Sequence, residues 1–309
     1  MQHTPIKSTM DAADWSKLVL LSVLWGSAFF LVEVALVAFS PLFIVAVRLA
    51  IAASILWVIV LAKGYPIPAA GPVWLMFFGI GLLNTVIPLL LISWSQTAIT
   101  AGLASILTAA TPVIGVVVAG LLLRDEPVTR RKLIGTIVGL IGVAVLVGPA
   151  AWTGIGHNLI AQLAVLLAAV MFALAGVYGR RFASLGIHPM TAAAGQLLAS
   201  AIVMLPALLI FEGLSSLAVT NATAWLAVAG LAVFSTAMAY VVYYSILRSA
   251  GAVNLSLVNL LLPATAILLG SSFLGEKLQF WQLAGLAVIL AGLVILDGRA
   301  WRPRSRTTR

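Results

Sequence analysis

Two sets of polar residues share a spacing that would place each set on one face of a helix. Ser105, Thr108 and Pro112 lie three and four residues apart within one long apolar run. The same order and spacing returns 151 residues later as Ser256, Asn259 and Pro263. Buried hydroxyl and amide groups can hold a polar solute, and a proline frees a backbone carbonyl for a ligand. The two sets therefore predict walls of a solute-binding site, with hydrogen bonding between helices as an equal alternative.

Aromatic and amide side chains in other apolar runs form a second group of candidate solute contacts. Tyr240 and Tyr178 carry rings that can stack on a planar or cationic solute and hydroxyls that can orient its polar end. Trp25 lies in the middle of a run, and Asn84 stands four residues before Pro88. Aromatic residues also gather at membrane borders, and amides also join helices, so packing is the alternative for each. We expect these side chains to contact a solute, and we expect Pro88, like Pro112 and Pro263, to act as a hinge or to line the cavity.

Glu33 and Arg48 are the clear ionisable residues within apolar runs. Charges in such places are costly, so they tend to pair or to serve function. Both would lie toward the same end of their helices, and we expect them to form an ion pair. An outer gate and a site for a charged solute are the alternatives. One glutamate is little support for proton coupling, so a facilitator, an exchanger and a proton-coupled carrier all stay open.

Other chemistries lack the residues that they need. The chain has no Cys, and His3, His157 and His188 fall near expected loops or the terminus. It has no G-x-x-x-x-G-K-[ST] phosphate loop for an ATP-driven pump. We therefore expect no catalytic residues, no metal site and no cofactor, and we do not expect an enzyme. Nucleic acid is not an expected partner, because the basic residues are spread between apolar runs.

The composition calls for lipid as the solvent. Of the 309 residues, 63% are hydrophobic and 8% are charged, whereas about a quarter are charged in soluble domains. A bilayer core takes about 20 helical residues to cross, so each long apolar run predicts one transmembrane helix. The expected helices lie near residues 16–36, 42–62, 72–94, 98–122, 132–149, 158–178, 190–210, 224–246, 252–274 and 281–298. The fold class is therefore an all-α integral membrane protein with ten transmembrane helices.

The basic residues predict how these helices are oriented. Fifteen of the 17 Lys and Arg residues fall on one side of the expected topology, and only Lys277 falls on the other. Arg48 lies within a helix. Loops rich in Lys and Arg stay in the cytoplasm, so both termini are expected there. The basic cytoplasmic tail, residues 299–309, is expected to contact anionic membrane lipid.

The chain also repeats itself at an offset of about 150 residues. Matched positions include Pro41 with Pro189, Arg48 with Gln196, Trp74 with Trp225, Thr85 with Thr236, and Glu126 with Glu276. Five helices per copy is an odd number, so the second copy must enter the membrane in the opposite orientation. After a cytoplasmic segment at 1–15, we expect residues 16–149 and 150–298 to form two inverted repeats. Such repeats are common in secondary transporters, which bind solutes between them near the midplane.

Several short motifs carry a resemblance to a known family. They are Trp25-Gly26-Ser27-Ala28-Phe29, Pro41 followed by Arg48, Ala101-Gly102, Pro112 with Glu126, Pro263, Gly275-Glu276 and Gly285. As a set, they resemble the EamA-like family of the drug/metabolite transporter superfamily, over nearly the whole chain. The chain looks most like the YddG type, which exports aromatic amino acids and methyl viologen. One departure is Glu33, where many relatives have Lys, so no role of that cation carries over.

The resemblance implies a ten-helix carrier around a central cavity in the bacterial inner (plasma) membrane. The expected function is export of amino acids, in particular aromatic ones, and of related small metabolites or drugs by alternating access. A membrane channel or a facilitator for other small metabolites is the alternative. Glycines at positions 135, 139, 142, 285 and 292 predict close approach of helices, either within each half or between two copies in a homodimer.

Overall fold

The computed structural model describes residues 11–122, 130–147, 157–213, 218–255, 258–275, 277 and 279–297. Within these ranges every regular element is a helix, and no strand is present. The expected boundary at 149–150, residues 1–10 of the amino-terminal segment and the tail at 299–309 lie outside the described residues. The all-helical class expected from the apolar runs is confirmed for the part of the chain that is described.

Nine helical elements lie between residues 12 and 184 of the described chain. They are α1 (Ala12–Leu36), α2 (Pro41–Ala62), α3 (Gly71–Gly81), the π-helix η1 (Leu82–Val86), α4 (Ile87–Ser95), α5 (Ala101–Thr108), α6 (Thr111–Leu122), α7 (Arg130–Val147) and α8 (His157–Ser184). The remaining elements are α9 (Pro189–Phe211), α10 (Ala222–Ala232), the π-helix η4 (Val233–Met238), α11 (Ala239–Leu255), α12 (Val258–Phe273) and α13 (Phe280–Asp297). Their bounds follow the expected helices closely, with two exceptions. α8 runs six residues past its expected end at 178, and α11 runs four residues into the range expected to start at 252.

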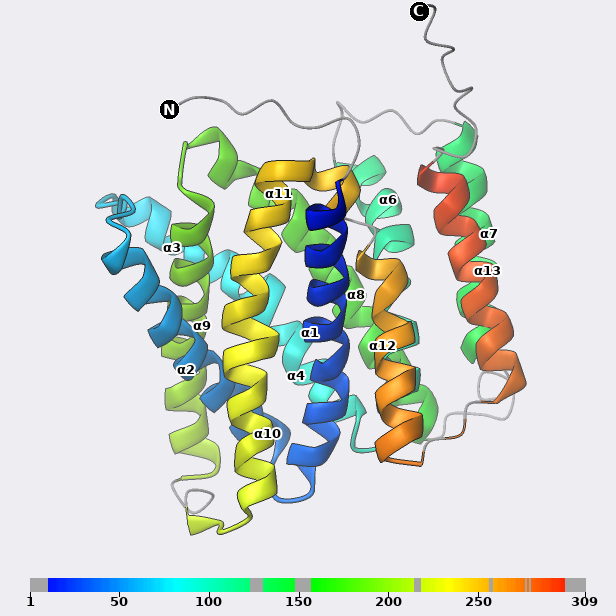
Figure 1. The fold of residues 1–309 in the computed structure, drawn as a ribbon, viewed down its shortest axis with the longest axis horizontal. Coiled ribbons are helices and arrows are strands. Elements are labelled where there is room, and N and C mark those ends of the chain that lie inside the picture. Colours follow the sequence, from blue (N-terminus) through cyan, green and yellow to red (C-terminus); the bar gives the residue numbers. More distant parts are fainter. Residues whose placement is uncertain are drawn as a thin grey trace, which may run out of the picture.

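Seven helical stretches among the described residues are long and apolar enough to cross a membrane. They are Ala12–Leu36, Pro41–Ala62, Gly71–Ser95, Ala101–Leu122, Leu159–Gly179, Pro189–Phe211 and Ala222–Ile246. Shorter apolar helices lie at Leu133–Gly142 and Phe280–Gly292. The helices run back and forth as one bundle, with the start of α1 and the end of α13 at the same end (Figure 1).

The expected helix at 98–122 is divided by a short turn at residues 109–110, which separates α5 from α6. Pro112 has no N–H to donate to the carbonyl of Thr108. That carbonyl instead accepts a hydrogen bond of 2.6 Å from the hydroxyl of Thr111. The proline therefore distorts the helix as expected, and a neighbouring side chain satisfies the freed carbonyl.

Helices α2 and α9 form an antiparallel pair that is fastened at both ends. Both helices begin with a proline, whose fixed backbone angle suits the first helical turn. At the start of α2, the hydroxyl of Ser40 donates to the carboxylate of Glu212, which follows α9, at 2.6 and 2.7 Å. At the other end the ring of Tyr65 stacks on His188, with the ring centres 3.9 Å apart.

The π-helices η1 and η4 interrupt two long helices at positions 151 residues apart. The wider turn leaves carbonyls without their usual helical partner. Thr85 donates to the carbonyl of Gly81 in η1, and Thr236 donates to the carbonyl of Leu231 at 2.8 Å in η4. In both π-helices, the hydroxyl of a threonine in the same helix therefore donates a hydrogen bond to one of the backbone carbonyls.

Two tryptophans at the same offset make the same contact before these interruptions. The indole N–H of Trp74 donates to the carbonyl of Pro68 at 3.1 Å, and that of Trp225 donates to the carbonyl of Val219 at 2.9 Å. In each case the acceptor lies six residues before the tryptophan, so the loop that precedes the helix folds back against the indole ring in the same way.

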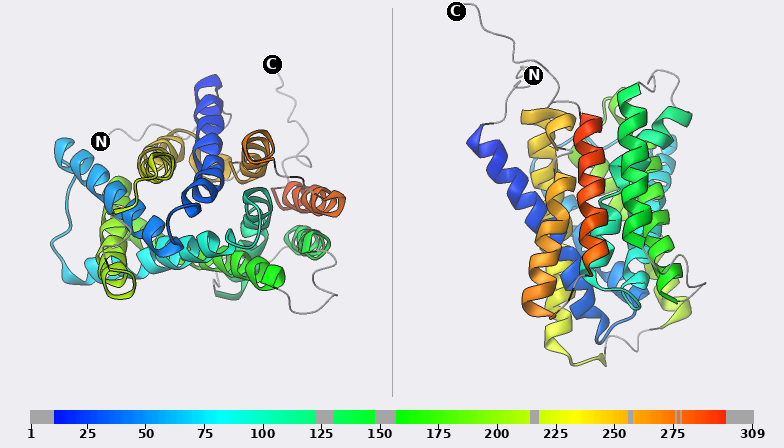
Figure 2. Two further views of the ribbon diagram at one scale, coloured as in Figure 1. Left: turned by 90° about the horizontal axis from the view of Figure 1, so that it is seen from below. Right: turned by 90° about the vertical axis from the view of Figure 1, so that its right-hand side faces the viewer.

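Helices α7 and α13 pack side by side at one edge of the bundle, as Figure 2 shows from below. A Cβ atom added to Gly142 would lie 2.6 Å from the backbone nitrogen of Ile289, and one added to Gly292 would lie 2.7 Å from that of Gly139. The absent side chains allow the two backbones to touch. Glycines from the two expected halves thus meet within one chain, whereas a contact between two copies stays a prediction.

Replacement of Gly142 by Val should destabilise the α7–α13 contact by about 1–3 kcal/mol, because the new side chain would overlap the backbone of α13. The apparent melting temperature of the purified protein in detergent measures this. Gly115→Val in α6 is the matched control, since nothing lies within 4 Å of an added Cβ there. Equal melting temperatures of the two variants would show that the close contact is not maintained.

Candidate functional site

The hydroxyl of Tyr240 is the meeting point of three elements. The amide nitrogen of Asn84 in η1 donates to it at 3.2 Å, and the amide nitrogen of Gln196 in α9 donates to it as well. Asn84 also donates weakly to the amide oxygen of Gln196 at 3.5 Å. Asn84 and Tyr240 remain partly exposed, so a solute could reach their polar atoms. The structure thus brings together two of the predicted contact residues.

Arg48 of α2 reaches the same place from another direction. Its Nε donates to the hydroxyl oxygen of Thr236 at 2.6 Å, and only 6% of the residue is exposed. Thr236 precedes Tyr240 by four residues, so both stand on nearly the same helical face. Arg48 is also near enough to Tyr240 to interact with it electrostatically. We call these five residues, Arg48, Asn84, Gln196, Thr236 and Tyr240, the Tyr240 cluster.

A second contact between η1 and α9 lies next to the cluster. The hydroxyls of Thr85 and Ser200 share a hydrogen bond of 2.6 Å, which joins η1 to α9. The two helices approach closely at Gly81, where an added Cβ would lie 2.7 Å from the hydroxyl oxygen of Ser200. Glycine is therefore required one turn before Asn84 to hold η1 against α9. This close approach lets both amides reach one hydroxyl.

Hydrogen-bond donors outnumber acceptors in the Tyr240 cluster. Arg48 carries five N–H donors and no acceptor, and both amides direct their N–H groups toward the tyrosine oxygen. The cluster is suited to bind an oxygen-rich polar solute. Among the described residues, no group of three His, Cys, Asp or Glu side chains could hold a metal ion.

Glu33 and Arg48 have different partners in the described part of the chain, instead of the ion pair expected between them. A carboxylate oxygen of Glu33 accepts from the backbone N–H of Ala101 at 2.8 Å. Ala101 is the first residue of α5, where backbone N–H groups have no helical acceptor and a negative charge is favourable. The carboxylate of Glu33 therefore accepts a hydrogen bond from the start of α5, whereas the sequence predicted that it would pair with Arg48.

The predicted polar face of α5 is used within its own helix. Ser105 is fully buried and donates to the carbonyl of Gly102 at 2.7 Å, and Thr108 donates to the carbonyl of Ala104 at 2.8 Å. Neither contact reaches the Tyr240 cluster. Ser256 lies outside the described residues, as do the side chains of Asn259 and Pro263, so the matching face of the second half stays a prediction.

A row of half-buried aromatic rings leads away from the Tyr240 cluster. Tyr240 stacks on Tyr244 with ring centres 6.2 Å apart, and Tyr244 contacts Tyr243 at 5.0 Å. Tyr243 in turn contacts Trp25 of α1 at 5.7 Å. The structure thereby connects Trp25, a predicted solute contact, to Tyr240 through the rings of Tyr243 and Tyr244.

The remaining predicted residues have structural surroundings of their own. Tyr178 lies between α8 and α3, where its hydroxyl would be 2.9 Å from a Cβ on Gly79, and the guanidinium of Arg181 lies over its ring. Pro88 is buried in the first turn of α4, directly after η1. The π-helix η1 therefore lies on the amino-terminal side of the proline, and a hinge or cavity role of Pro88 stays a prediction.

Sequence interpretation missed Gln196 and Thr236 as members of the cluster. Both were visible as repeat partners, Gln196 of Arg48 and Thr236 of Thr85. Polar residues at matched positions of two halves were a usable signal, because such positions converge where the halves meet. The sequence did not show which side chains would touch.

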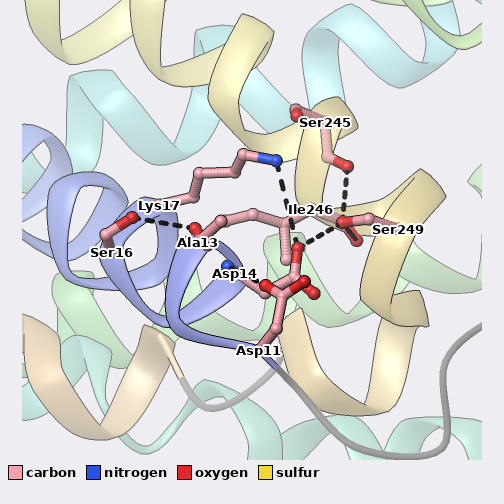
Figure 3. Close-up of polar contacts among 8 residues, drawn as sticks. All are labelled: Asp11, Ala13, Asp14, Ser16, Lys17, Ser245, Ile246 and Ser249. Carbon is pink, nitrogen blue, oxygen red and sulfur yellow. Dashed lines mark hydrogen bonds and ion pairs between the residues drawn. The ribbon is translucent and has the colours of Figure 1, made fainter.

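A separate polar contact fastens the start of α1 to α11 (Figure 3). Asp14 is 2% exposed, and its Oδ1 accepts from the hydroxyl of Ser249 at 2.7 Å and lies 3.9 Å from the Nζ of Lys17. Its other oxygen, Oδ2, is buried and has no hydrogen-bond partner among the described residues. This contact lies at the end of the bundle where α1 begins.

Replacement of Thr236 by Val should lower the stability of the protein by about 1–3 kcal/mol, because the buried Nε of Arg48 would lose its acceptor. Valine keeps nearly the same shape, so the lost oxygen is the main change. Thr223→Val on the exposed side of α10 is the matched control. Melting curves of both variants in detergent measure the effect, and indistinguishable curves would contradict the assigned hydrogen bond.

Comparisons with known proteins agree with the helical architecture. The model of the EamA-like transporter family matches residues 15–148 and again residues 159–296. The chain is 28% identical to Protein PecM of Dickeya dadantii over 275 residues, which cover 88% of each chain. It is 27% identical to the uncharacterized inner membrane transporter YedA of Escherichia coli (strain K12) over 290 residues, which cover 89% of this chain and 88% of that one.

One solved crystal structure shares the fold, with a TM-score of 0.67 and 20% identity over 95% of this chain and all of that chain. An uncharacterized transporter, YvbV of Bacillus subtilis (strain 168), is 28% identical over 284 residues, which cover 92% of this chain and 91% of the relative. The two family matches together span most of the sequence and include every residue of the Tyr240 cluster. This multi-pass membrane protein belongs to the EamA-like transporter family.

Proposed function

We propose that the protein is a secondary transporter that exports amino acids, in particular aromatic ones, and related small metabolites or drugs across the bacterial inner membrane. One observation carries the proposal. The hydroxyl of Tyr240 in the second half of the chain receives hydrogen bonds from Asn84 of the first half and Gln196 of the second. A polar cluster shared between halves, inside an apolar bundle, suits a solute site near the midplane.

The proposal includes ten transmembrane helices in two inverted repeats. The family model matches two successive segments of similar length, which supports a duplication. The π-helices η1 and η4 and the Trp74 and Trp225 contacts recur at an offset of 151 residues. The pairs α2–α9 and α7–α13 each join helices at matching places in the two halves. Five spans per repeat make the second repeat inverted.

Alternating access follows from how the halves are joined. The Tyr240 cluster and the adjoining Thr85–Ser200 contact join them through a few hydrogen bonds, beside the packed α2–α9 and α7–α13 helix pairs. A solute that offers its own acceptors can replace such bonds, which large apolar contacts would not permit. The halves can then rock about the site and expose it to either side of the membrane.

The aromatic row suggests the kind of solute. Next to the polar cluster lie the half-buried rings of Tyr240, Tyr244, Tyr243 and Trp25, and a solute with an aromatic side chain can stack on them.

The distribution of Lys and Arg supports cytoplasmic termini. Membrane lipid is the expected surrounding partner, and a homodimer stays a separate proposal.

Uptake of radiolabelled L-phenylalanine into proteoliposomes tests the proposal, with and without unlabelled substrate inside. A carrier should show saturable uptake that internal substrate stimulates. L-Alanine serves as the aliphatic comparison. Unitary currents in planar bilayers, together with absent counterflow, would favour the channel alternative.

Replacement of Tyr240 by Phe should reduce this uptake roughly tenfold, because two amides lose their shared acceptor, at about 1–1.5 kcal/mol. Tyr65→Phe is the control, since that ring stacks on His188 at the end of the bundle. Both variants should purify with the elution profile of the original protein. Unchanged uptake by Tyr240→Phe would remove Tyr240 from the solute site.

A further inference from the structure

We propose that Arg48 binds the carboxylate group of the transported solute. This proposal rests on the proposed transport function and adds the chemical group that the site recognises. Only 6% of Arg48 is exposed, and the residue lies within a helix apolar enough to cross a membrane. A cation in such a place is costly unless a negative group or a ligand compensates it.

The described carboxylates are engaged elsewhere. Glu33 accepts from the start of α5, Glu212 accepts from Ser40 beyond the end of α9, and Asp14 contacts Ser249 at the start of α1. No ion pair joins Arg48 to an acidic side chain in the described part of the chain. Thr236 supplies a neutral oxygen to one of its N–H groups, so the positive charge has no anionic partner among the described residues.

The rest of the cluster fits the same ligand. Asn84 and Gln196 are neutral donors to the hydroxyl of Tyr240, and Tyr240 can donate its own proton while it accepts from them. A carboxylate has two oxygens that match the planar fork of an arginine and accept further hydrogen bonds. Replacing the amide-to-tyrosine bonds by bonds to a carboxylate would keep every donor satisfied.

The charge of the cluster favours a single negative group. Arg48 is its one cation, and its other members are neutral. A doubly charged phosphate would leave one negative charge unbalanced in an apolar surrounding, whereas one carboxylate balances the guanidinium. In the second half, Gln196 stands where the first half has Arg48, so the carboxylate end of the solute should face α2.

Four probes with one phenyl scaffold separate the groups involved. L-Phenylalanine has a carboxylate and an amine, 3-phenylpropanoate has only the carboxylate, phenylalaninamide has the amine with a neutral amide, and phenethylamine has only the amine. Binding of each to the purified protein in lipid nanodiscs is measured by titration calorimetry. We expect both carboxylates to bind at least tenfold tighter than the other two. A comparison of phenylalanine with phenylpropanoate then shows whether the amine contributes.

Arg48→Gln should remove this preference, and Arg48→Lys should keep only part of it, because lysine retains the charge without the planar fork. Arg130→Gln, at the exposed start of α7, is the matched control and should keep the full preference. If Arg48→Gln does not fold, the probe series on the original protein and on Arg48→Lys still decides the matter. A preference retained by a folded Arg48→Gln variant would overturn the assignment.

The proposal is also wrong if probes with and without a carboxylate bind equally, if only the two probes without a carboxylate bind, or if neither carboxylate probe binds. Saturable counterflow of another solute under those conditions would leave the transporter proposal standing. Absence of counterflow for every solute, together with carboxylate binding that depends on Arg48, would instead remove the transporter proposal and keep the binding site.

Discussion

A guanidinium inside an apolar helix bundle must find its hydrogen-bond acceptors within the bundle, because hydrocarbon offers none. Arg48 meets this requirement through Thr236, a residue of a π-helix, and the arrangement of four helices follows from it. The wider turn of η4 places Thr236 and Tyr240 toward α2 and α9, and the matching turn η1 brings Asn84 to the same oxygen. The polar cluster is therefore a property of how these helices meet, and no single segment contains it.

Other parts of the bundle have the opposite character. At the α7–α13 contact, Gly142 and Gly292 let two backbones touch over a wide area, and no polar group is needed to hold them. The Tyr240 cluster instead depends on a few directional bonds that a ligand can replace. If the protein works by the proposed alternating access, a close-packed edge could move as a unit, and the polar centre could exchange its hydrogen bonds with a solute.

Much of the architecture could be predicted because the membrane imposes simple rules. The thickness of the hydrocarbon sets helix length, so apolar runs placed α2 and α9 within one or two residues. Tyr240 and Asn84 were recognisable because polar atoms in such runs are rare. The partners of Glu33 and Arg48 were not recognisable, because pairing depends on which helix ends lie nearby. Ser105 and Thr108 show the same limit, since a hydroxyl on a helix can bond its own backbone as readily as a solute.

The π-helices have a consequence for how such a chain can change over time. Each widens one turn, each follows a tryptophan that folds back on the preceding loop, and each contains a polar residue of the cluster, Asn84 in η1 and Thr236 in η4. Loss of one residue between Trp74 and Asn84 would tighten the turn and rotate the two side chains relative to each other by about 100°. Outside Gly79 and Gly81, where an added Cβ would meet Tyr178 or Ser200, a point substitution in this stretch keeps the register of the site, whereas a single inserted or deleted codon would shift it. The length of these segments is therefore under stricter constraint than their composition.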